Sequence, residues 1–469
     1  MATLTGGTFL VALALGFGAS SFQIGLLAAI PTLANLFQLL ALYLLHKYAN
    51  RKAIAVVCSV FARLPLLLIG FLPLLFPAKT GILLLISLVF THYFFGALSG
   101  TSWSSWLKDL VPEEILGSYF SHRSRIIQIV SVSLSLIVAF ALDYVKAYSP
   151  GDINTVYSVM FFLGGAFGLY GVYLIFLTPE PRIQPVNKNM IKLFRQPLAE
   201  PNFRNFLIFN SCWAFAVNLA APFFTVYMLK MLKFPLSYVV IFSIINQVSS
   251  ILFIRMWGRY SDKYSNKTVL RICAPIYLCC IFAWTFTTFP DQHAFTIPLL
   301  VLIHIGCGMA LGGINLSLNN IGFKLAPGKE DAAVFLSARS LVIAFFAGIA
   351  PIFGGMFADF FSQHELNWNI EWKGPLGNTI IQTLSLQSWD FFFFTASFLG
   401  LFALYRLTFV KEEGEVGRRV VVRELSVELG KEMRALSTLA GLKAIMFLPF
   451  SLFSFARNKQ KDQKAYAQE

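Results

Sequence analysis

Two short stretches, HKYANRK at residues 46–52 and DKYSNK at residues 262–267, repeat one phrase within this 469-residue chain. The Lys, Tyr and Asn of the first copy recur 216 positions later in the second. The letter before the Lys differs, because His46 stands where the second copy has Asp262. A phrase that returns in the same order within each half of a chain predicts an internal duplication of the fold.

The composition places the chain in a membrane. Hydrophobic residues make up 57% of the sequence and charged residues only 13%, whereas soluble domains are about 45–50% apolar and about 25% charged. A helix needs about 20 apolar residues to cross the hydrocarbon core of a bilayer, and lipid offers the backbone no other hydrogen-bond partners. We therefore predict an all-α fold with twelve membrane-spanning helices, at residues 1–19, 22–45, 53–76, 81–107, 126–145, 155–177, 205–230, 237–256, 270–289, 296–323, 338–359 and 387–409.

The basic residues predict the orientation of these helices. Of the 37 Lys and Arg residues, 31 fall on one side of the predicted membrane and five on the other, with Arg63 inside a helix. Loops rich in Lys and Arg stay in the cytoplasm. We expect both termini to be cytoplasmic in a multi-pass protein of the inner (plasma) membrane. The net charge of +14 then serves orientation, and we expect no nucleic-acid partner.

The repeat extends beyond the first phrase. The sequence LVP at residues 110–112 corresponds to LAP at residues 325–327, and Asp143 at the end of the fifth span corresponds to Asp359 at the end of the eleventh. We predict a first six-helix bundle at residues 1–177 and a second at residues 205–410. A cytoplasmic linker at residues 178–204 joins them, and a cytoplasmic tail follows at residues 411–469. The tail contains an apolar stretch at residues 436–456, which we interpret as an interfacial helix, with a thirteenth span as the alternative.

The repeat also bears on the start of the chain. The seventh span begins near Asn205, and its counterpart in the first half would begin before Met1. We therefore expect the chain as given to begin inside its first helix, with a signal peptide as the competing interpretation. The six cysteines lie in or beside predicted spans without the spacing of a zinc site, so we expect buried free thiols, no metal and no cofactor.

These features resemble the major facilitator superfamily. GRYSDKYSNK at residues 258–267 is similar to the family signature Gly-x-x-x-Asp-Arg-x-Gly-Arg-Lys, whereas the first copy has Leu42 and His46 in place of the Gly and the Asp. WLKDLVPEEILGSYFSHRSR at residues 106–125 is similar to a loop in a bacterial branch of the superfamily. The Gly/Pro motif of drug antiporters is missing from the fifth span, and its nearest match is GIAPIFGG at residues 348–355, which weighs against drug export.

The resemblance implies a conformational gate at the repeated phrase. Asp262 is expected to face the start of the fifth span, where the partial positive charge of a helix N-terminus favours a carboxylate. His46 cannot act as a fixed anion, so the first-half gate is expected to be weaker. The alternative is that these basic residues only orient the protein. The predicted gate consists of Gly258, Asp262, Lys263, Lys267, Lys47, Arg51, Arg123, Arg125 and Arg339.

Polar residues inside the spans are candidates for binding a solute. Arg63 is the clear intramembrane cation, although its side chain can also extend to the headgroups. His92 and His304 lie in spans that line the central cavity in this superfamily, although an isolated His more often bonds to a neighbouring helix. The candidate cavity residues are Arg63, His92, Asn210, Asn218, His304 and Asn315.

We therefore expect a secondary-active transporter that moves a small solute by alternating access, as a monomer in the lipid bilayer, with a coupling proton or ion as a further partner. The chain contains no Walker A sequence, which argues against direct use of ATP. The alternatives are a transport-inactive membrane sensor on the same fold and an integral-membrane lipid-handling enzyme. The enzyme would need clustered acids or metal ligands at one face of the membrane, so we expect no enzymatic activity. The solute itself is not encoded in a recognisable motif.

Overall fold

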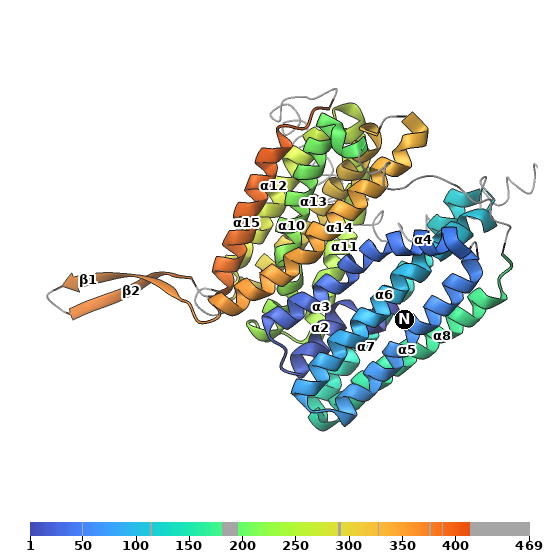
Figure 1. Ribbon diagram of the computed structural model, residues 1–469. Coiled ribbons are helices and arrows are strands. Elements are labelled where there is room, and N and C mark those ends of the chain that lie inside the picture. The colour runs from blue at the N-terminus through green and yellow to red at the C-terminus, as the bar shows by residue number, and fades with distance from the viewer. Residues whose placement is uncertain are drawn as a thin grey trace, which may run out of the picture. The chain divides into compact units, whose positions relative to one another are not determined.

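A computed structural model describes residues 1–48, 50–112, 115–180, 196–288, 292–326, 328–374, 377–386 and 388–412. Residues 1–413 form one compact unit. Most of the predicted linker and the predicted interfacial helix at residues 436–456 lie outside the described residues. Figure 1 shows the helices of the first half in blue to teal and those of the second half in green to orange.

The first half contains α1 (Ala2–Thr5), α2 (Gly7–Gly16), α3 (Ser21–Ala34), the 3-10 turn Asn35–Phe37, α4 (Gln38–Tyr48), α5 (Arg51–Leu75), α6 (Ala78–Leu110), α7 (Leu116–Tyr148), the 3-10 turn Pro150–Asp152 and α8 (Ile153–Leu177). The second half contains α10 (Pro201–Lys230), α11 (Leu236–Lys263), α12 (Asn266–Ala283), the 3-10 turn Trp284–Phe286, α13 (Thr296–Lys324), α14 (Gly328–Phe361), β1 (Leu366–Gly374), β2 (Gly377–Leu386) and α15 (Ser388–Leu407).

The predicted membrane helices are confirmed within the described residues. Eleven helices are long and apolar enough to span a bilayer, and a shorter apolar helical stretch, Ala2–Gly16, precedes them. We call the end at which α3 and α11 begin the outer end, and the end at which α5 and α12 begin the inner end. The inner end carries the loops that the distribution of Lys and Arg predicts to be cytoplasmic.

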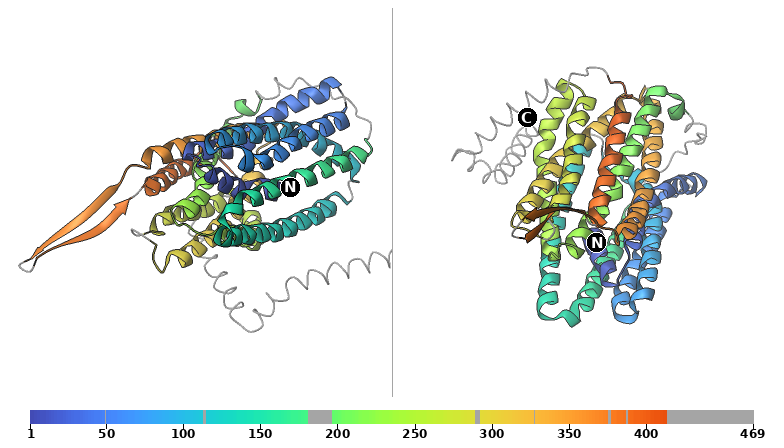
Figure 2. Two further views of the ribbon diagram at one scale, coloured as in Figure 1. Left: turned by 90° about the horizontal axis from the view of Figure 1, so that it is seen from below. Right: turned by 90° about the vertical axis from the view of Figure 1, so that its left-hand side faces the viewer.

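A β-hairpin between α14 and α15 was not predicted from the sequence. Strands β1 and β2 pair antiparallel from Leu366 opposite Leu386 to Gly374 opposite Gly377, with an irregularity after Trp368. Figures 1 and 2 show the hairpin extending away from the helices at the outer end. The alternation of apolar and polar letters in LNWNIEW at residues 366–372 is the strand signal. The apolar spans on either side predict only a connection here.

The cysteines differ in part from the expectation. All six are free, and Cys58, Cys273 and Cys307 are buried as predicted. Cys279 is exposed, however, on a helix that the composition places in lipid. A thiol is a weakly polar group that lipid tolerates, so apolar surroundings do not force it into the protein interior.

Helices α3 and α14 join the two halves at backbone contact. A Cβ atom added to Gly25 would overlap the carbonyl oxygen of Pro351, and one added to Gly355 would overlap the carbonyl oxygen of Ser21. Small residues allow such close approach of membrane helices, where van der Waals packing replaces the hydrophobic driving force. The sequence GIAPIFGG at residues 348–355 therefore serves as a packing surface for α3.

Substituting Gly25→Ala tests this packing. The added methyl group must push α3 away from Pro351, and overpacking of this kind costs about 1–3 kcal/mol. The control is Gly171→Ala in α8, where an added Cβ meets nothing within 4 Å and Ala stabilises a helix by roughly 0.5–1 kcal/mol. We expect Gly25→Ala to lower the thermal unfolding midpoint of the purified protein and Gly171→Ala to keep or raise it. Equal midpoints for the two variants would contradict close packing of α3 on α14.

Candidate transport pathway and its gates

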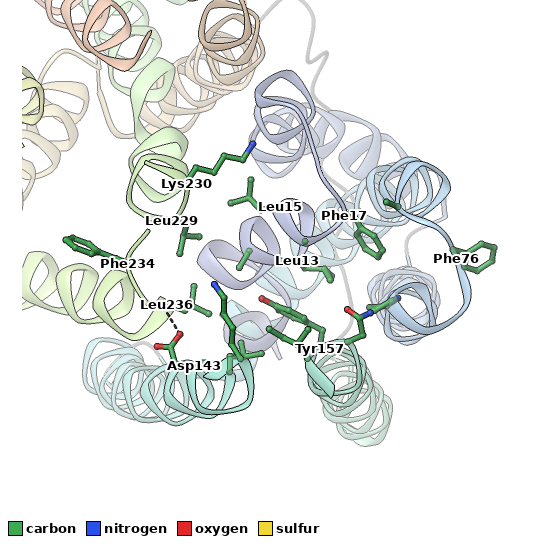
Figure 3. A pocket seen from close by; sticks show the side chains of 18 residues that line it. Leu13, Leu15, Phe17, Phe76, Asp143, Tyr157, Leu229, Lys230, Phe234 and Leu236 are labelled. Carbon is green, nitrogen blue, oxygen red and sulfur yellow. Dashed lines mark hydrogen bonds between the residues drawn. The ribbon is translucent and has the colours of Figure 1, made fainter. Parts of the chain in front are cut away.

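At the outer end, a carboxylate of the first half binds a helix of the second half. Asp143 lies at the outer end of α7, and its two carboxylate oxygens accept hydrogen bonds from the backbone amides of Leu236 and Ser237, each 2.8 Å long. These are the first two residues of α11. A dashed line in Figure 3 marks the bond from Leu236 to Asp143. The contact therefore joins the two predicted bundles.

The repeat supplies a second contact of the same kind in the opposite sense. Asp359 lies near the outer end of α14, in the second half, and its oxygens accept the backbone amides of Ser21 and Phe22 at 2.8 Å each. These amides begin α3, and the next amide, that of Gln23, donates a hydrogen bond to the Ser20 hydroxyl. Asp143 and Asp359 are 216 positions apart. Each half therefore supplies one carboxylate that binds the first backbone amides of a helix in the other half.

Both contacts have the chemistry of a reversible gate. The first amides of a helix have no partner within the helix, and the helix dipole favours negative charge there. Hydrogen bonds to a charged group contribute about 1.5–3 kcal/mol. Each carboxylate accepts two of them, so the outer ends are held together by bonds that can break without any covalent change. The repeat places Asp143 and Asp359 at corresponding positions in the sequence, but it does not by itself predict which helices they contact.

At the inner end, a carboxylate caps α5 within the first half. Glu180, which follows α8, accepts the backbone amides of Arg51 and Lys52 at 2.8 and 3.2 Å. The side chain of Arg51 is buried and bonds Asp109 at 2.6 Å. Arg51 thus ties the start of α5 to the end of α6 and braces the first half.

The second half has the matching brace. Glu412, which follows α15, accepts the backbone amide of Lys267 and the side-chain amide of Asn266, both at 2.7 Å. Lys324 at the end of α13 pairs with Glu412 at 3.0 Å. The buried ammonium of Lys267 donates to the carbonyl oxygen of Val410. The predicted gate residues Arg51 and Lys267 therefore occupy equivalent positions inside their own halves.

The other predicted gate residues lie mostly at the inner surface. Asp262, Arg123 and Arg125 are exposed. Among the described residues, no hydrogen bond or ion pair joins Asp262 to either arginine. Lys47 lies over the ring of Tyr48, 5.4 Å from its centroid, and Lys263 lies over Tyr264 at 5.0 Å.

Gly258 and Arg339 also belong to the predicted gate, and both lie within the second half. A Cβ atom added to Gly258 would meet nothing within 4 Å, so this position carries no close contact. The Arg339 guanidinium bonds Asn319 at 3.2 Å and lies over the ring of Phe206. Arg339 thus connects α14 to α13 and α10 of its own half.

Two predicted cavity residues lie close together inside the first half. His92 Nδ1 bonds the carbonyl oxygen of Ala62 at 2.5 Å, beside Arg63 in the chain. Arg63 packs against Gly168 of α8, and its Nε atom is buried without a hydrogen bond among the described residues. This pair is therefore placed between helices of one half.

The remaining predicted cavity residues are dispersed through the second half. His304 is buried, bonds the Leu300 carbonyl of its own helix at 2.8 Å, and stacks on Phe242. Asn218 likewise bonds its own helix, at Ala214. Asn210 is buried, whereas Asn315 is exposed. The structure does not gather these residues into one site, and their role in binding stays a prediction.

A cavity of about 290 Å³ lies between the halves, lined by residues of α1, α2, α7 and α11. We call it the inter-half cavity. Its polar side chains are hydroxyls and one carboxamide, and no charged residue is among the residues that line it. Thr3 donates to Ser131 across it at 3.1 Å. The polar lining consists of Thr3, Thr8, Ser131, Ser135, Ser243 and Gln247.

Comparison with solved structures supports the fold. The nucleoside transporter NupG matches with a TM-score of 0.60 and 16% identity, over 88% of this chain and 96% of that one. A D-xylose–proton symporter matches with a TM-score of 0.59 and 14% identity, over 89% of this chain and 95% of that one. The xylose transporter XylE from E. coli, solved inward open, matches with a TM-score of 0.57 and 15% identity, over 85% of this chain and 89% of that one.

A search of curated protein sequences found no match. The sequence profile of the Major Facilitator Superfamily matches residues 1–345, which is well over half of the chain. This match agrees with the two related halves, the apolar helices and the repeated phrase at residues 46–52 and 262–267. The chain therefore belongs to the major facilitator superfamily of membrane transporters.

Proposed function

We propose that this protein is a secondary-active transporter that moves a small, uncharged, hydroxylated solute by alternating access. The observation that carries the proposal is the exchange of carboxylates at the outer end, where Asp143 and Asp359 each bind the other half. At the inner end, the corresponding acid of the repeated phrase, Asp262, is exposed. This arrangement is the one expected of a transporter closed at its outer end and open at its inner end.

The cycle follows from which carboxylates are bound. When the outer ends separate, the amides of α3 and α11 lose Asp359 and Asp143 and gain water. The resemblance of residues 258–267 to the family signature implies that Asp262 then binds the start of α7. Each state is favoured by its own set of helix-end contacts, so a solute shifts the balance only by binding one state better. The braces at Glu180 and Glu412 lie within single halves and stay intact throughout.

The inter-half cavity supports the assignment of the solute class. It lies between the repeats, where solutes bind in transporters built from two related halves. Hydroxyl and carboxamide groups donate and accept hydrogen bonds, and they match the hydroxyls of a sugar or a nucleoside. The volume of about 290 Å³ is just below the range of about 300–1,000 Å³ that is usual for pockets of drug-sized ligands, so it suits a small solute. Structural neighbours that transport a nucleoside or xylose agree with this class.

The gate can be tested with a reporter cysteine at Ser243, which lines the inter-half cavity, in a background without the native cysteines. We expect Asp143→Asn to raise labelling of this cysteine by an impermeant maleimide from outside by about tenfold, because a loss of about 1.4 kcal/mol changes a population tenfold. Asp262→Asn should lower both outside labelling and transport, since it weakens the opposite state.

The matched control is Asp152→Asn, which removes a charge from an exposed outer carboxylate that caps no described helix through its side chain. It should label at the wild-type rate. Equal labelling of Asp143→Asn and Asp152→Asn would remove Asp143 from the gate.

The solute site can be tested in proteoliposomes, with and without a proton gradient, using neutral sugars and nucleosides that raise the thermal midpoint. For a solute that is transported, we expect Gln247→Leu to raise KM about three- to tenfold, because a lost hydrogen bond contributes about 0.5–1.5 kcal/mol. Ser135→Ala should act in the same direction, and Ser133→Ala, on the same helix but outside the cavity lining, should leave KM unchanged.

Two results would count against this proposal. Saturable binding without transport would identify a sensor on the transporter fold. A solute whose KM is indifferent to Gln247 and Ser135 would bind elsewhere.

A further inference from the structure

A second cavity, of about 510 Å³, lies at the outer end beside the Asp143 contact. We call it the outer cavity. Residues from both halves line it. Helices α2, α5, α6, α7 and α8 contribute from the first half, and the end of α10, the following turn and the start of α11 contribute from the second. Figure 3 shows Leu13 and Tyr157 on the first-half side and Leu229 and Phe234 on the second-half side.

The lining combines an apolar wall with a small number of polar groups. The wall is formed by aliphatic and aromatic side chains, including Leu13, Phe17, Leu142, Phe76 and Phe234. The polar groups are the ammoniums of Lys146 and Lys230, the hydroxyl of Tyr157, the carboxamide of Asn154 and the carboxylate of Asp143. An apolar pocket with a few polar groups is the usual form of a small-molecule site, and this volume is within the range of about 300–1,000 Å³.

Two basic residues of the outer side line this cavity. The predicted outer loops contain five lysines, namely Lys79, Lys146, Lys230, Lys233 and Lys373. Lys146 comes from the first half and Lys230 from the second, and both line the cavity. The orientation rule does not explain why two of so few outer lysines line one cavity, since it places lysines on the opposite side.

Nearby acids cancel only part of this charge. Asp143 also lines the cavity and keeps its negative charge, although both of its oxygens accept backbone amides of α11. The two lining lysines and this one carboxylate leave the lining with a net charge of +1, and Asp152, one position before the lining residue Ile153, is exposed to solvent. The Lys230 ammonium donates to the Ala19 carbonyl at 3.4 Å, a long bond that leaves two of its protons for other acceptors. The cavity thus offers cationic donors above an apolar wall.

We propose that the outer cavity binds an amphipathic anion, with its carboxylate or phosphate group at Lys146 and Lys230 and its apolar body against the wall. Lysine binds such groups as a point charge with three donors. The ligand is either a soluble organic anion or an anionic lipid of the outer leaflet, and the chemistry that binds the two is the same.

The occupant stabilises the closed outer end. Asp143 and Leu236 are partners in the contact between halves, and both line the outer cavity. When the halves separate at this end, the second-half lining residues between Leu229 and Leu236 move away from the first-half lining residues, and the cavity is lost. A ligand that binds only the assembled cavity favours the closed arrangement by mass action. The amphipathic anion is therefore a regulator that acts from outside, and this effect, unlike the binding itself, rests on the proposed transport function.

Binding can be measured with decanoate on the full chain in nanodiscs of phosphatidylcholine, which has no net charge. We expect saturable binding that weakens at least tenfold in the double variant Lys146→Gln/Lys230→Gln. Decyltrimethylammonium, with the same chain and the opposite charge, should bind at least tenfold more weakly than decanoate. The control Lys373→Gln removes an outer charge on β1, outside the cavity lining, and should bind decanoate as the wild type does.

Decanoate that binds the double variant as well as the wild type would show mere partition into the bilayer and would overturn the site. Adding phosphatidylglycerol to the nanodiscs identifies the source: competition with decanoate supports the site with a lipid as its occupant, and undiminished binding supports it with a soluble anion.

The regulatory effect is read separately. Decanoate should reduce outside labelling of the Ser243 reporter cysteine in the Asp143→Asn variant, and it should not do so once Lys146 and Lys230 are replaced. Binding that leaves labelling unchanged would overturn the regulatory role. Because the binding experiment needs no solute, a failure to find transport would count against the proposed function and not against the site.

Discussion

The first amides of a helix lack partners inside that helix, so each needs an acceptor from elsewhere in the chain or from water. Four helices of this protein meet that constraint with a carboxylate from elsewhere in the chain. Asp143 and Asp359 cap α11 and α3 across the two halves, whereas Glu180 and Glu412 cap α5 and α12 within one half. The same interaction therefore does two things. Within a half it joins neighbouring helices, and between halves it joins the two bundles at the outer end, where the proposed cycle requires the contact to break.

The two contacts between the halves are related by the repeat but differ in what surrounds them. Near Asp359, α3 and α14 touch through Gly25 and Gly355 with no room for a methyl group. Beside Asp143, the helices border a cavity of about 510 Å³ that reaches both halves. Close packing transmits motion without adjustment, because an interior at van der Waals contact cannot absorb a shift. A cavity can instead be filled, so a ligand can influence the gate at Asp143 but finds no space beside Gly25.

The sequence predicts the membrane helices well, because a membrane helix is recognised by the length and apolar composition of its segment. It found the first and last residues of helices less well, and it missed the strands at residues 366–386 because the alternation was read as part of a connection. For the site, the predicted gate at Asp262 stays a prediction. A carboxylate at a helix N-terminus was expected for Asp262, and the structure has that contact for Asp143 and Asp359. One sequence represents all states of a transporter, and a structure represents one of them.

The sequence by itself determined the class of protein and its run of apolar helices, eleven of which are long enough to span a bilayer within the described residues, since hydropathy depends only on the order of residues. The repeated phrase predicts that the two halves are related. It also showed that His46 and Asp262 make the halves unequal. Only the tertiary structure decided which polar groups meet. Arg51 and Lys267 are conspicuous in the repeated phrase yet brace single halves. Whether a side chain reaches a neighbouring helix depends on rotation about the helix axis and on the position of residues far apart in the chain, and neither is encoded in local spacing.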